Sequence, residues 1–413
     1  MSTDGRTAEP ESASVALESA TFVRLVTRAD GDALAASGLL AGALADREVP
    51  FQVTVGRTVA ERTDRAAASG PDADRNGDVT LVVGTADADR PQFGATDRPA
   101  TLDACEVVRD LGATPDPILA LAGLTAAGTD PGAGESEWLL EAARDRGRVE
   151  RRPGLVVPTQ NPIDGVAHST RVRAPWSGDP DAARDALAAV GPGDGDVSGA
   201  FDADDHRRIG SAVALDVVGA GDATTTAAAT VQQALRPYAT PEGPFATIGG
   251  YADVLAATAR TEPGTGAALA MGHDAGEAAL AAWRDYGRRA HAALADASTG
   301  RYDGLFVVSV DDGPVEAIAR VVAGYLSPEP VVLVVSEGHR PSGNQTQSDE
   351  ADGEAALAAR DDTLGATVEG VARELAAETD REIEYDAVRR RGYLRYDPAV
   401  DESTIVETVR AFQ

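Results

Sequence analysis

Residues 21–55 read TFVRLVTRADGDALAASGLLAGALADREVPFQVTV, and the fold class follows from this stretch. A short β-branched run over 22–26 predicts a strand, and an acidic turn with glycine follows it. Small apolar residues then predict a helix over 33–45, which Pro50 separates from a second strand over 51–55. Strand, helix and strand in this order form a βαβ unit, the building block of parallel sheets.

The rest of the chain continues this α/β pattern. Residues 79–83 (VTLVV) form a continuous apolar run, typical of a strand that is buried on both faces. From Tyr302 the pattern resets, and the runs at 302–310 and 329–338 predict strands with a helix between them. We therefore expect an α/β fold with four parts: a disordered tail over 1–18, a parallel-sheet domain over 19–150, a mixed, helical middle region over 151–295, and a smaller α/β domain over 296–413.

The charge balance indicates adaptation to salt. The chain has 67 acidic residues against 37 basic ones, a formal net charge of -30, and no lysine, so every basic residue is arginine. Such a charge opposes compaction in dilute buffer, whereas at 1 M salt the screening length falls to about 3 Å. We expect a halophilic protein. The acidity excludes no partner, because salt adaptation adds carboxylates everywhere and can hide a local arginine patch.

Cysteine usage and hydropathy limit the class of protein. Cys105 is the only cysteine, which excludes an intramolecular disulfide and a zinc site built from several cysteines. No N-terminal stretch has the basic-then-apolar form of a signal peptide, and no apolar run has the length of a membrane span. We expect a cytoplasmic protein with no membrane partner.

Two carboxylates, Asp30 and Asp32, follow the first predicted strand. In a parallel sheet, ligands bind outside the carboxyl ends of the strands. Carboxylate oxygens suit Mg²⁺ or Mn²⁺, and two such ions can clamp the attacking and leaving oxygens of a phosphodiester. The same residues also suit a solvated Asp-Gly turn in which an aspartate caps the helix. The pattern alone leaves both interpretations open.

This segment resembles the first motif of the DHH phosphoesterases, in which His-x-Asp-x-Asp-Gly follows the first strand and opens a helix of small residues. Asp30 and Asp32 match the two aspartates, Arg28 stands in place of the histidine, and Ala33 replaces the glycine. The run GGYADVLAATARTEPGTGAALAMGH at 249–273 is similar to a glycine-rich segment of archaeal RecJ-like proteins. The resemblance implies a RecJ-like DHH fold with divergent motifs.

The later motifs match less well. The aspartate that ends the third strand in the family is replaced by Gly84, with Asp87 as a displaced substitute, and the name-giving Asp-His-His corresponds to Asp97-Arg98-Pro99. The resemblance implies an Mn²⁺ or Mg²⁺ cofactor if the protein is active, and it assigns metal-binding and catalytic roles by position. Metal ligation falls to Asp30, Asp32, Asp87 and Asp97, and catalysis to Asp30, Asp32 and Asp97.

Arginine at two former ligand positions places positive charge where a cation should bind. Arg28 and Arg98 replace the expected histidines. We hypothesise that both guanidinium groups pair with Asp30, Asp32 and Asp97 and occupy the former metal site.

The region after Tyr302 is similar to the DHH-associated domain. In that family an arginine near the position of Arg360 and a glycine-rich loop hold the nucleic-acid backbone, and here the arginine is present without the loop. Arg389, Arg390 and Arg391 form a basic run flanked by Tyr385, Tyr393 and Tyr396. Arginine interleaved with aromatics suits single-stranded nucleic acid, and a charge-protected edge strand is the alternative.

The resemblance implies a protein of DNA replication or repair. Because the motifs are degenerate, we expect weak or lost catalysis, with binding of single-stranded nucleic acid or a scaffold role in the replisome. The family includes inactive relatives that link the replicative helicase to the GINS complex, which makes these possible partners. Two enzymatic alternatives stay open: a metal-dependent exonuclease on single-stranded DNA or RNA, and a phosphoesterase for short oligonucleotides or cyclic dinucleotides.

Overall fold

The computed structural model describes residues 10–68, 77–94, 97–188, 190, 201–336, 352–360 and 363–412. Contacts divide the chain into two compact units. The first unit contains Met1–Arg152, Val156–Thr159 and Pro237–Trp283, and the second contains Pro153–Leu155, Gln160–Arg236 and Arg284–Gln413. Segments far apart in the sequence therefore fold together in each unit.

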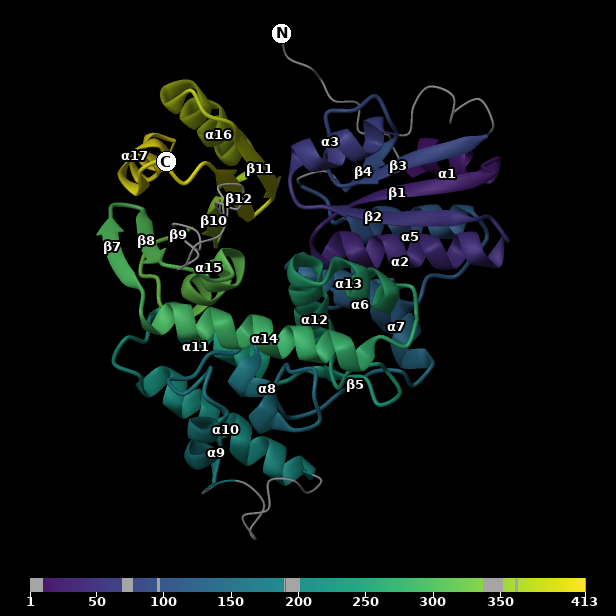
Figure 1. Ribbon diagram of the computed structural model, residues 1–413. Coiled ribbons are helices and arrows are strands. Elements are labelled where there is room, and N and C mark those ends of the chain that lie inside the picture. Colours follow the sequence, from purple (N-terminus) through teal and green to yellow (C-terminus); the bar gives the residue numbers. More distant parts are fainter. Residues whose placement is uncertain are drawn as a thin grey trace, which may run out of the picture. The chain divides into compact units, whose positions relative to one another are not determined.

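The first unit is built on a four-stranded parallel sheet with the strand order β2-β1-β3-β4 (Figure 1). Leu25 of the central strand pairs with Val53 on one side and Leu81 on the other. The apolar runs predicted from the sequence thus form adjacent strands. The strands are β1 (Phe22–Arg28), β2 (Phe51–Gly56), β3 (Asp78–Val83) and β4 (Gln92–Phe93).

Helix α2 (Gly31–Asp46) is the central helix of this unit and is buried on almost every side. It packs against the sheet, while α3 covers the opposite face (Figure 1). Small residues allow close packing, since a Cβ at Gly38 would lie 2.3 Å from the Ala270 carbonyl oxygen. The other elements are α1 (Pro10–Glu18), α3 (Val59–Ala67), α5 (Ala100–Asp110), α6 (Pro117–Ala126), η2 (Gly134–Ser136), α7 (Glu137–Asp145), β5 (Glu150–Arg151), β6 (Tyr238–Ala239), α12 (Ile248–Thr261) and α13 (Pro263–Ala270).

Helix α1 corrects the expectation of a disordered tail over residues 1–18. Pro10–Glu18 is helical, and Ala13 and Leu17 on it are fully buried. The helix packs against α5, so burial of its apolar side chains orders a stretch whose composition is otherwise polar. Residues before Pro10 lie outside the described part of the chain.

The second unit contains a six-stranded mixed sheet with the order β11-β12-β10-β9-β8-β7, in which only β8 and β9 pair in parallel. Strand β9 is buried on both faces, by α15 on one side and by the core under α16 and α17 on the other. The strands are β7 (Ser298–Tyr302), β8 (Leu305–Val310), β9 (Val331–Ser336), β10 (Gly353–Ala359), β11 (Ile383–Val388) and β12 (Arg391–Tyr396). The helices are α8 (Pro162–His168), α9 (Pro180–Leu187), α10 (Ala203–Gly219), α11 (Thr225–Ala234), α15 (Val315–Tyr325), α16 (Gly365–Thr379) and α17 (Glu402–Ala411), while α14 (Gly276–Ala295) has residues in both units.

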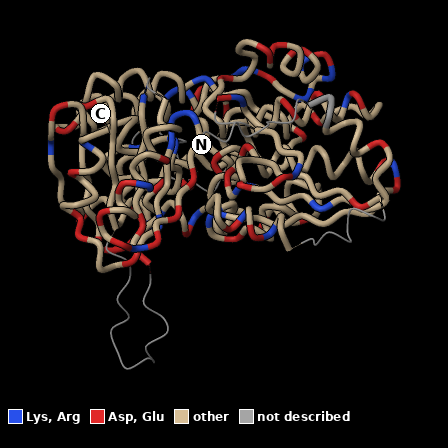
Figure 2. The backbone as a smooth tube through the Cα atoms, turned by 90° about the horizontal axis from the view of Figure 1, so that it is seen from above, with Lys and Arg blue, Asp and Glu red and all other residues tan. Residues whose placement is uncertain are grey.

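The predicted fold class is confirmed: a parallel sheet near the N-terminus, a helical middle and a C-terminal sheet domain. The exact domain boundaries expected from the sequence stay a prediction. Acidic residues occur along the whole described chain (Figure 2). Within the described residues, we find no helix with the length and apolar character needed to cross a membrane.

Candidate functional site

The candidate site lies at the carboxyl edge of the parallel sheet, where β1 leads into α2. Arg28 is the last residue of β1 and pairs in register with Gly56, the last residue of β2. The chain then turns, with the Ala29 amide donating to the Gly56 carbonyl at 3.1 Å, and α2 begins at Gly31. This geometry places the first motif at the edge where parallel sheets bind their ligands.

Arg28 occupies the space between the two motif aspartates. Its Nε donates to Asp30 Oδ2 at 2.8 Å, and its Nη2 lies 3.6 Å from Asp32 Oδ2. A longer contact of 3.5 Å joins Nη1 to the carbonyl oxygen of Gly94, which follows β4. All three charged side chains are at least 96% buried. The positive charge therefore sits at the position where the resemblance expects a metal ion.

Asp30 also caps the helix that follows. Its Oδ1 accepts from the Ala33 amide at 2.8 Å, in extended backbone geometry at the N-cap of α2. The capping turn and the ion pair are thus formed by the same carboxylate, one oxygen for each.

Asp32 holds the start of α5. Its two oxygens accept from the Ala100 amide at 2.8 Å, the Thr101 amide at 3.0 Å and the Thr101 hydroxyl at 2.7 Å. Pro99, the N-cap residue of α5, makes no side-chain cap of its own, so Asp32 supplies the cap from another helix. The first and third motif segments are therefore adjacent, joined through backbone amides.

Burial dominates the electrostatics of Asp32. Burial raises the pKa of Asp32 to about 6, and the nearby Asp30 carboxylate adds to the rise. Arg28 and the hydrogen bonds from Thr101 act in the opposite direction. Because Asp32 is shielded from water, its charged form depends on Arg28 and on the hydrogen bonds from Thr101 for stabilisation.

Gly84 gives Arg28 its room. It directly follows β3, where the family has an aspartate, and its φ of +127° lies in the region that favours glycine. A Cβ at Gly84 would lie 2.9 Å from Arg28 Cβ and 3.6 Å from Arg28 Nη1. A side chain at position 84 would therefore collide with Arg28, and glycine at this position leaves space for the buried guanidinium.

A second buried arginine at the same edge was not found from the sequence. Arg62 of α3 is fully buried, and its guanidinium donates to the carbonyl oxygens of Thr85 at 2.8 Å, Gly56 at 3.2 Å and Arg57 at 3.3 Å. These oxygens lie at or just after the ends of β2 and β3. The sequence gives no signal for this arginine, because the acceptors in these three hydrogen bonds are backbone carbonyl oxygens, which every residue has.

The remaining predicted ligands lie away from this cluster. Asp87 and Asp97 are both exposed, and the Asp87 amide donates to the Thr63 hydroxyl at 2.9 Å. Arg98 forms ion pairs with the buried Asp103 and with the more exposed Glu106 and Glu135. The pairing hypothesis therefore holds for Arg28 with Asp30 and Asp32. It is wrong for Arg98, because the loop before α5 directs that side chain toward α5 instead.

The arrangement does not fit a divalent ion. Both oxygens of Asp32 accept hydrogen bonds from Ala100 and Thr101, and Arg28 neutralises the carboxylate pair. Among the residues that the structure describes, no group of three or more His, Cys, Asp or Glu side chains could hold a metal ion. A second cation beside the guanidinium would meet repulsion in a buried site of low polarity.

Arg360 lies inside the second unit as a structural residue. Its guanidinium donates to the Thr226 hydroxyl and to the carbonyl oxygens of Ser327, at 3.1 Å, and Glu329. It thereby ties the start of α11 to the loop that leads into β9.

Arg389 and Arg390 are exposed in the turn between β11 and β12, and Arg391 is half-buried. Two of the three flanking tyrosines are buried, at 1% exposure for Tyr393 and 3% for Tyr396. Their hydroxyl groups bond within the sheet, Tyr393 to Glu354 and Tyr396 to backbone carbonyls. These two rings are therefore not placed to stack with bases, and the arginines remain as candidate phosphate contacts.

Comparison with known proteins yields relatives of two kinds. Residues 297–411 match the family model described as "Uncharacterized protein rrnAC1427, C-terminal domain". The uncharacterized protein rrnAC1427 of Haloarcula marismortui is 45% identical over 348 residues, which cover 82% of this chain and 85% of that protein.

Among solved structures, Cdc45 from Entamoeba histolytica aligns over 98% of this chain and 99% of its own length, with a TM-score of 0.56 and 7% identity. Exonuclease RecJ bound to manganese aligns over 98% of this chain and 94% of its own, with a TM-score of 0.44 and 15% identity. The match to Cdc45 extends over both units and shows a shared fold. It agrees with the predicted architecture, a divergent RecJ-like DHH fold.

Proposed function

The chain belongs to the family of the Haloarcula marismortui protein rrnAC1427, and we propose that it is a non-catalytic RecJ-like protein of DNA replication or repair. It acts in the cytoplasm as a scaffold that binds other proteins. The observation that carries the proposal is the buried Arg28 guanidinium, 2.8 Å from Asp30 and 3.6 Å from Asp32.

Hydrolysis by metal-activated water requires an ion among these carboxylates, and the ion would have to displace Arg28. Displacement would leave the buried Arg28 guanidinium without its carboxylate partners, and an uncompensated buried charge costs about 3–5 kcal/mol. In addition, Asp32 would have to give up the amide groups of Ala100 and Thr101, which it caps at the start of α5. The site as folded is complete without an ion.

A scaffold protein needs a rigid fold around this site but no metal ion or catalytic group in it. Arg28 joins the end of β1 to Gly94, Asp30 begins α2, and Asp32 begins α5. These contacts hold the turns together through protein atoms alone. The sequence resembles a family with inactive members that link the replicative helicase to the GINS complex. This resemblance supports the helicase and GINS as protein partners.

Binding of single-stranded nucleic acid is a second candidate function, favoured by the two exposed arginines of the β11–β12 turn, Arg389 and Arg390. Phosphate contacts need accessible cations, and these two meet that requirement while Arg360 is engaged internally. The net charge of -30 opposes a polyanion outside such a patch.

Nuclease activity is tested first with end-labelled single-stranded DNA and RNA in molar KCl with Mn²⁺, beside a known active exonuclease. We expect no loss of label from the wild type. Cleavage by the wild type that an Asp30→Ala, Asp32→Ala double variant abolishes would overturn the proposal, and it would assign catalysis to the pair Asp30 and Asp32.

The partner class is tested by comparing helicase or GINS capture with binding of a fluorescent single strand, measured by anisotropy. An Arg389→Ala, Arg390→Ala variant is compared with Arg288→Ala, Arg289→Ala, which removes the same charge from arginines paired with Asp285 and Asp312. Protein capture that both variants retain supports the scaffold. Strand binding that only the first variant loses would favour the second candidate.

A further inference from the structure

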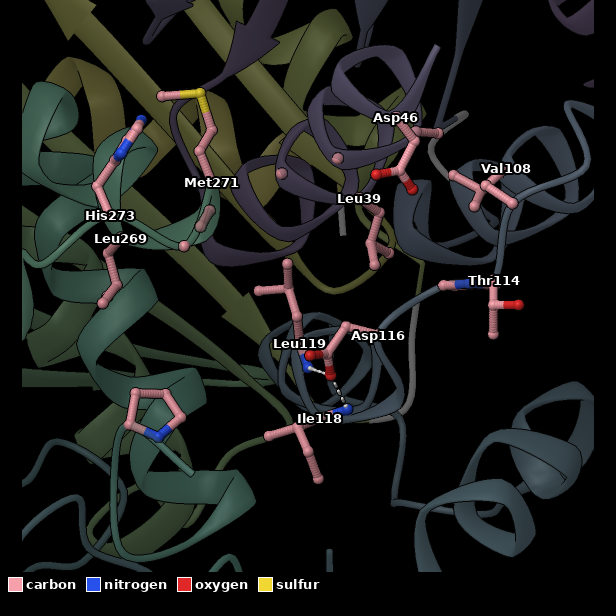
Figure 3. A pocket seen from close by; sticks show the side chains of 18 of the residues that line it. Leu39, Asp46, Val108, Thr114, Asp116, Ile118, Leu119, Leu269, Met271 and His273 are labelled. Carbon is pink, nitrogen blue, oxygen red and sulfur yellow. Dashed lines mark hydrogen bonds between the residues drawn. The ribbon is translucent and has the colours of Figure 1, made fainter. Parts of the chain in front are cut away.

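A pocket of about 420 Å³ opens in the first unit beside the C-terminal half of α2 (Figure 3). It is separate from the Arg28 cluster, which lies at the N-terminal end of the same helix. The floor is apolar, and Figure 3 shows side chains from α2, α6 and the end of α13 around one space. The main apolar side chains are Leu39, Ile118, Leu119 and Leu269. The volume lies in the range of small-molecule sites, roughly 300–1,000 Å³.

Two glycines of α2 explain why the pocket is open. At Gly38 the backbone of α13 presses on α2, since a Cβ there would lie 2.3 Å from the Ala270 carbonyl oxygen. At Gly42, one turn later, a Cβ would meet nothing within 4 Å. The helices therefore touch at one turn and separate at the next, which leaves a recess with a wall of bare helix backbone.

The mouth of the pocket is electrostatically negative. Asp46 is the last residue of α2, is exposed, and has no ion pair with any residue in the described part of the chain. Helix α13 also ends at the pocket, with Met271 as its C-cap. The C-terminal ends of helices carry partial negative charge, so the ends of α2 and α13 add to the carboxylate.

The one arginine in the lining is already neutralised. Arg148 donates to both oxygens of Asp116, at 3.1 Å and 3.2 Å. Asp116 in turn caps α6 by accepting from the amides of Ile118 and Leu119, as the dashed lines in Figure 3 show. The N-terminal end of α6 is thus capped as well, and Asp46 keeps an uncompensated charge at the rim.

Tyr251 of α12 supplies a polar atom in the wall. The residue is only 5% exposed, yet its hydroxyl makes no hydrogen bond to any residue that the structure describes. Burial and the Asp116 carboxylate both raise the pKa of Tyr251, so the hydroxyl stays protonated. Buried hydroxyl groups are normally satisfied, and one that lines a pocket is available to a ligand.

We propose that this pocket binds a small organic cation, an amine or guanidine on an apolar body. The cationic head lies at Asp46, the apolar body packs on Leu39 and Leu269, and the Tyr251 hydroxyl accepts or donates a hydrogen bond within the wall. This inference is independent of the proposed scaffold function, because it uses none of the residues of the Arg28 cluster.

The head group is tested with three probes that share one body: 4-phenylbutylamine, 4-phenylbutanol and 4-phenylbutyrate. Dissociation constants are measured by saturation-transfer NMR on the full chain in KCl. We expect the amine to bind more tightly than the alcohol, and the carboxylate to bind least. Equal binding of the three probes, or tightest binding of the carboxylate, would overturn the proposal.

The position of the head is tested with Asp46→Asn. We expect amine binding to weaken roughly two- to fivefold, as for one partly exposed ion pair, with no change for the alcohol. Asp145→Asn is the matched control, because Asp145 is also the exposed last residue of a helix, α7, and does not line the pocket. Equal effects of the two variants would show a general charge effect and contradict the assignment.

The location is tested with Gly42→Leu, which adds a side chain where the structure has open space and keeps a residue favourable to a helix. We expect the variant to fold, as circular dichroism would show, and to lose binding of both amine and alcohol. Tyr251→Phe removes only the hydroxyl, and it should weaken both probes while thermal stability is kept. Unchanged amine binding in folded Gly42→Leu would place the probe elsewhere and reject the pocket.

Discussion

Arg28 and Arg98 stand at two positions where the family resemblance places histidine, and the structure treats them in opposite ways. The Arg28 side chain is 3% exposed and paired with two buried aspartates, whereas the Arg98 side chain is 35% exposed and pairs with the buried Asp103 and with two more exposed glutamates. Arg28 ends the central strand β1, which fixes its direction. Arg98 lies in the loop before α5, so nearby acidic residues decide its orientation. Replacement of histidine by arginine thus gives a buried ion-pair cluster at Arg28 and a more exposed ion-pair network at Arg98.

The largest effect is expected for Arg28→Ala. The variant leaves Asp30 and Asp32 buried without their cation, and we expect the free energy of unfolding to fall by about 3–5 kcal/mol. Urea unfolding in constant KCl measures the change. A loss below 1 kcal/mol would mean that the cluster is hydrated and exchangeable, and the contrast with Arg98 would disappear.

The next effect concerns pH and Asp32. Burial raises the pKa of Asp32 to about 6, above the value of about 3.9 in an unfolded chain, so the folded state binds this proton more tightly. The resulting stability is fully present below pH 4 and is lost as pH rises through 6, by about 2–3 kcal/mol. We expect the difference in unfolding free energy between wild type and Asp32→Asn to change by this amount between pH 4 and pH 7. Parallel pH curves for the two proteins would contradict it.

A smaller effect is expected for Arg98→Ala. Its pairs with Glu106 and Glu135 are partly exposed, whereas Asp103 is buried, so we expect a loss of about 1–2 kcal/mol of which only the exposed part shrinks as KCl increases. Unfolding at low and molar KCl gives the comparison, with Arg28→Ala measured in parallel. A loss independent of salt and as large as that of Arg28→Ala would place Arg98 in the structural core.

The smallest effect is expected from metal. Millimolar Mn²⁺ should leave the melting temperature of the wild type unchanged. By comparison, a metal site would stabilise the folded state by about 2.7 kcal/mol at a metal concentration a hundred times its Kd. Arg28→His should also show no manganese-dependent shift, because Asp87 and Asp97 are exposed and do not join Asp30 and Asp32. A clear rise in melting temperature for the wild type that EDTA reverses would sharpen the enzymatic alternative.

Local patterns in the sequence predicted the elements, and the family resemblance led to the ion pairs of the site. The apolar run and the acidic turn predicted β1 and α2, and arginine at a former ligand position suggested that Arg28 pairs with Asp30 and Asp32. The role of Asp32 could not be predicted, because its partners Ala100 and Thr101 lie 68 and 69 residues away and bond mainly through the backbone. Such contacts depend on how helices pack, which no local spacing encodes.

The same limit applies to the tyrosines beside the C-terminal arginines. The spacing of Tyr393 and Tyr396 around the arginine run resembles a stacking surface, yet both rings are buried in the sheet. Side chains alternate along β12, so Tyr396 lies in the core with α16 residues while Tyr393 faces the other side of the sheet and bonds to Glu354; both faces are covered. Arg62 was missed for a related reason, since its fully buried position depends on where β2 and β3 end.

Asp32 caps α5, and Arg28 neutralises the charge of Asp32. This arrangement affects how the protein reaches its folded state. A fold whose central turn is closed by an ion reaches its final state only after that ion has been acquired, and chelators can reverse the step. Here the turn is closed by groups of the chain itself. This turn can therefore close as soon as both segments have been synthesised, without a step that waits for an ion.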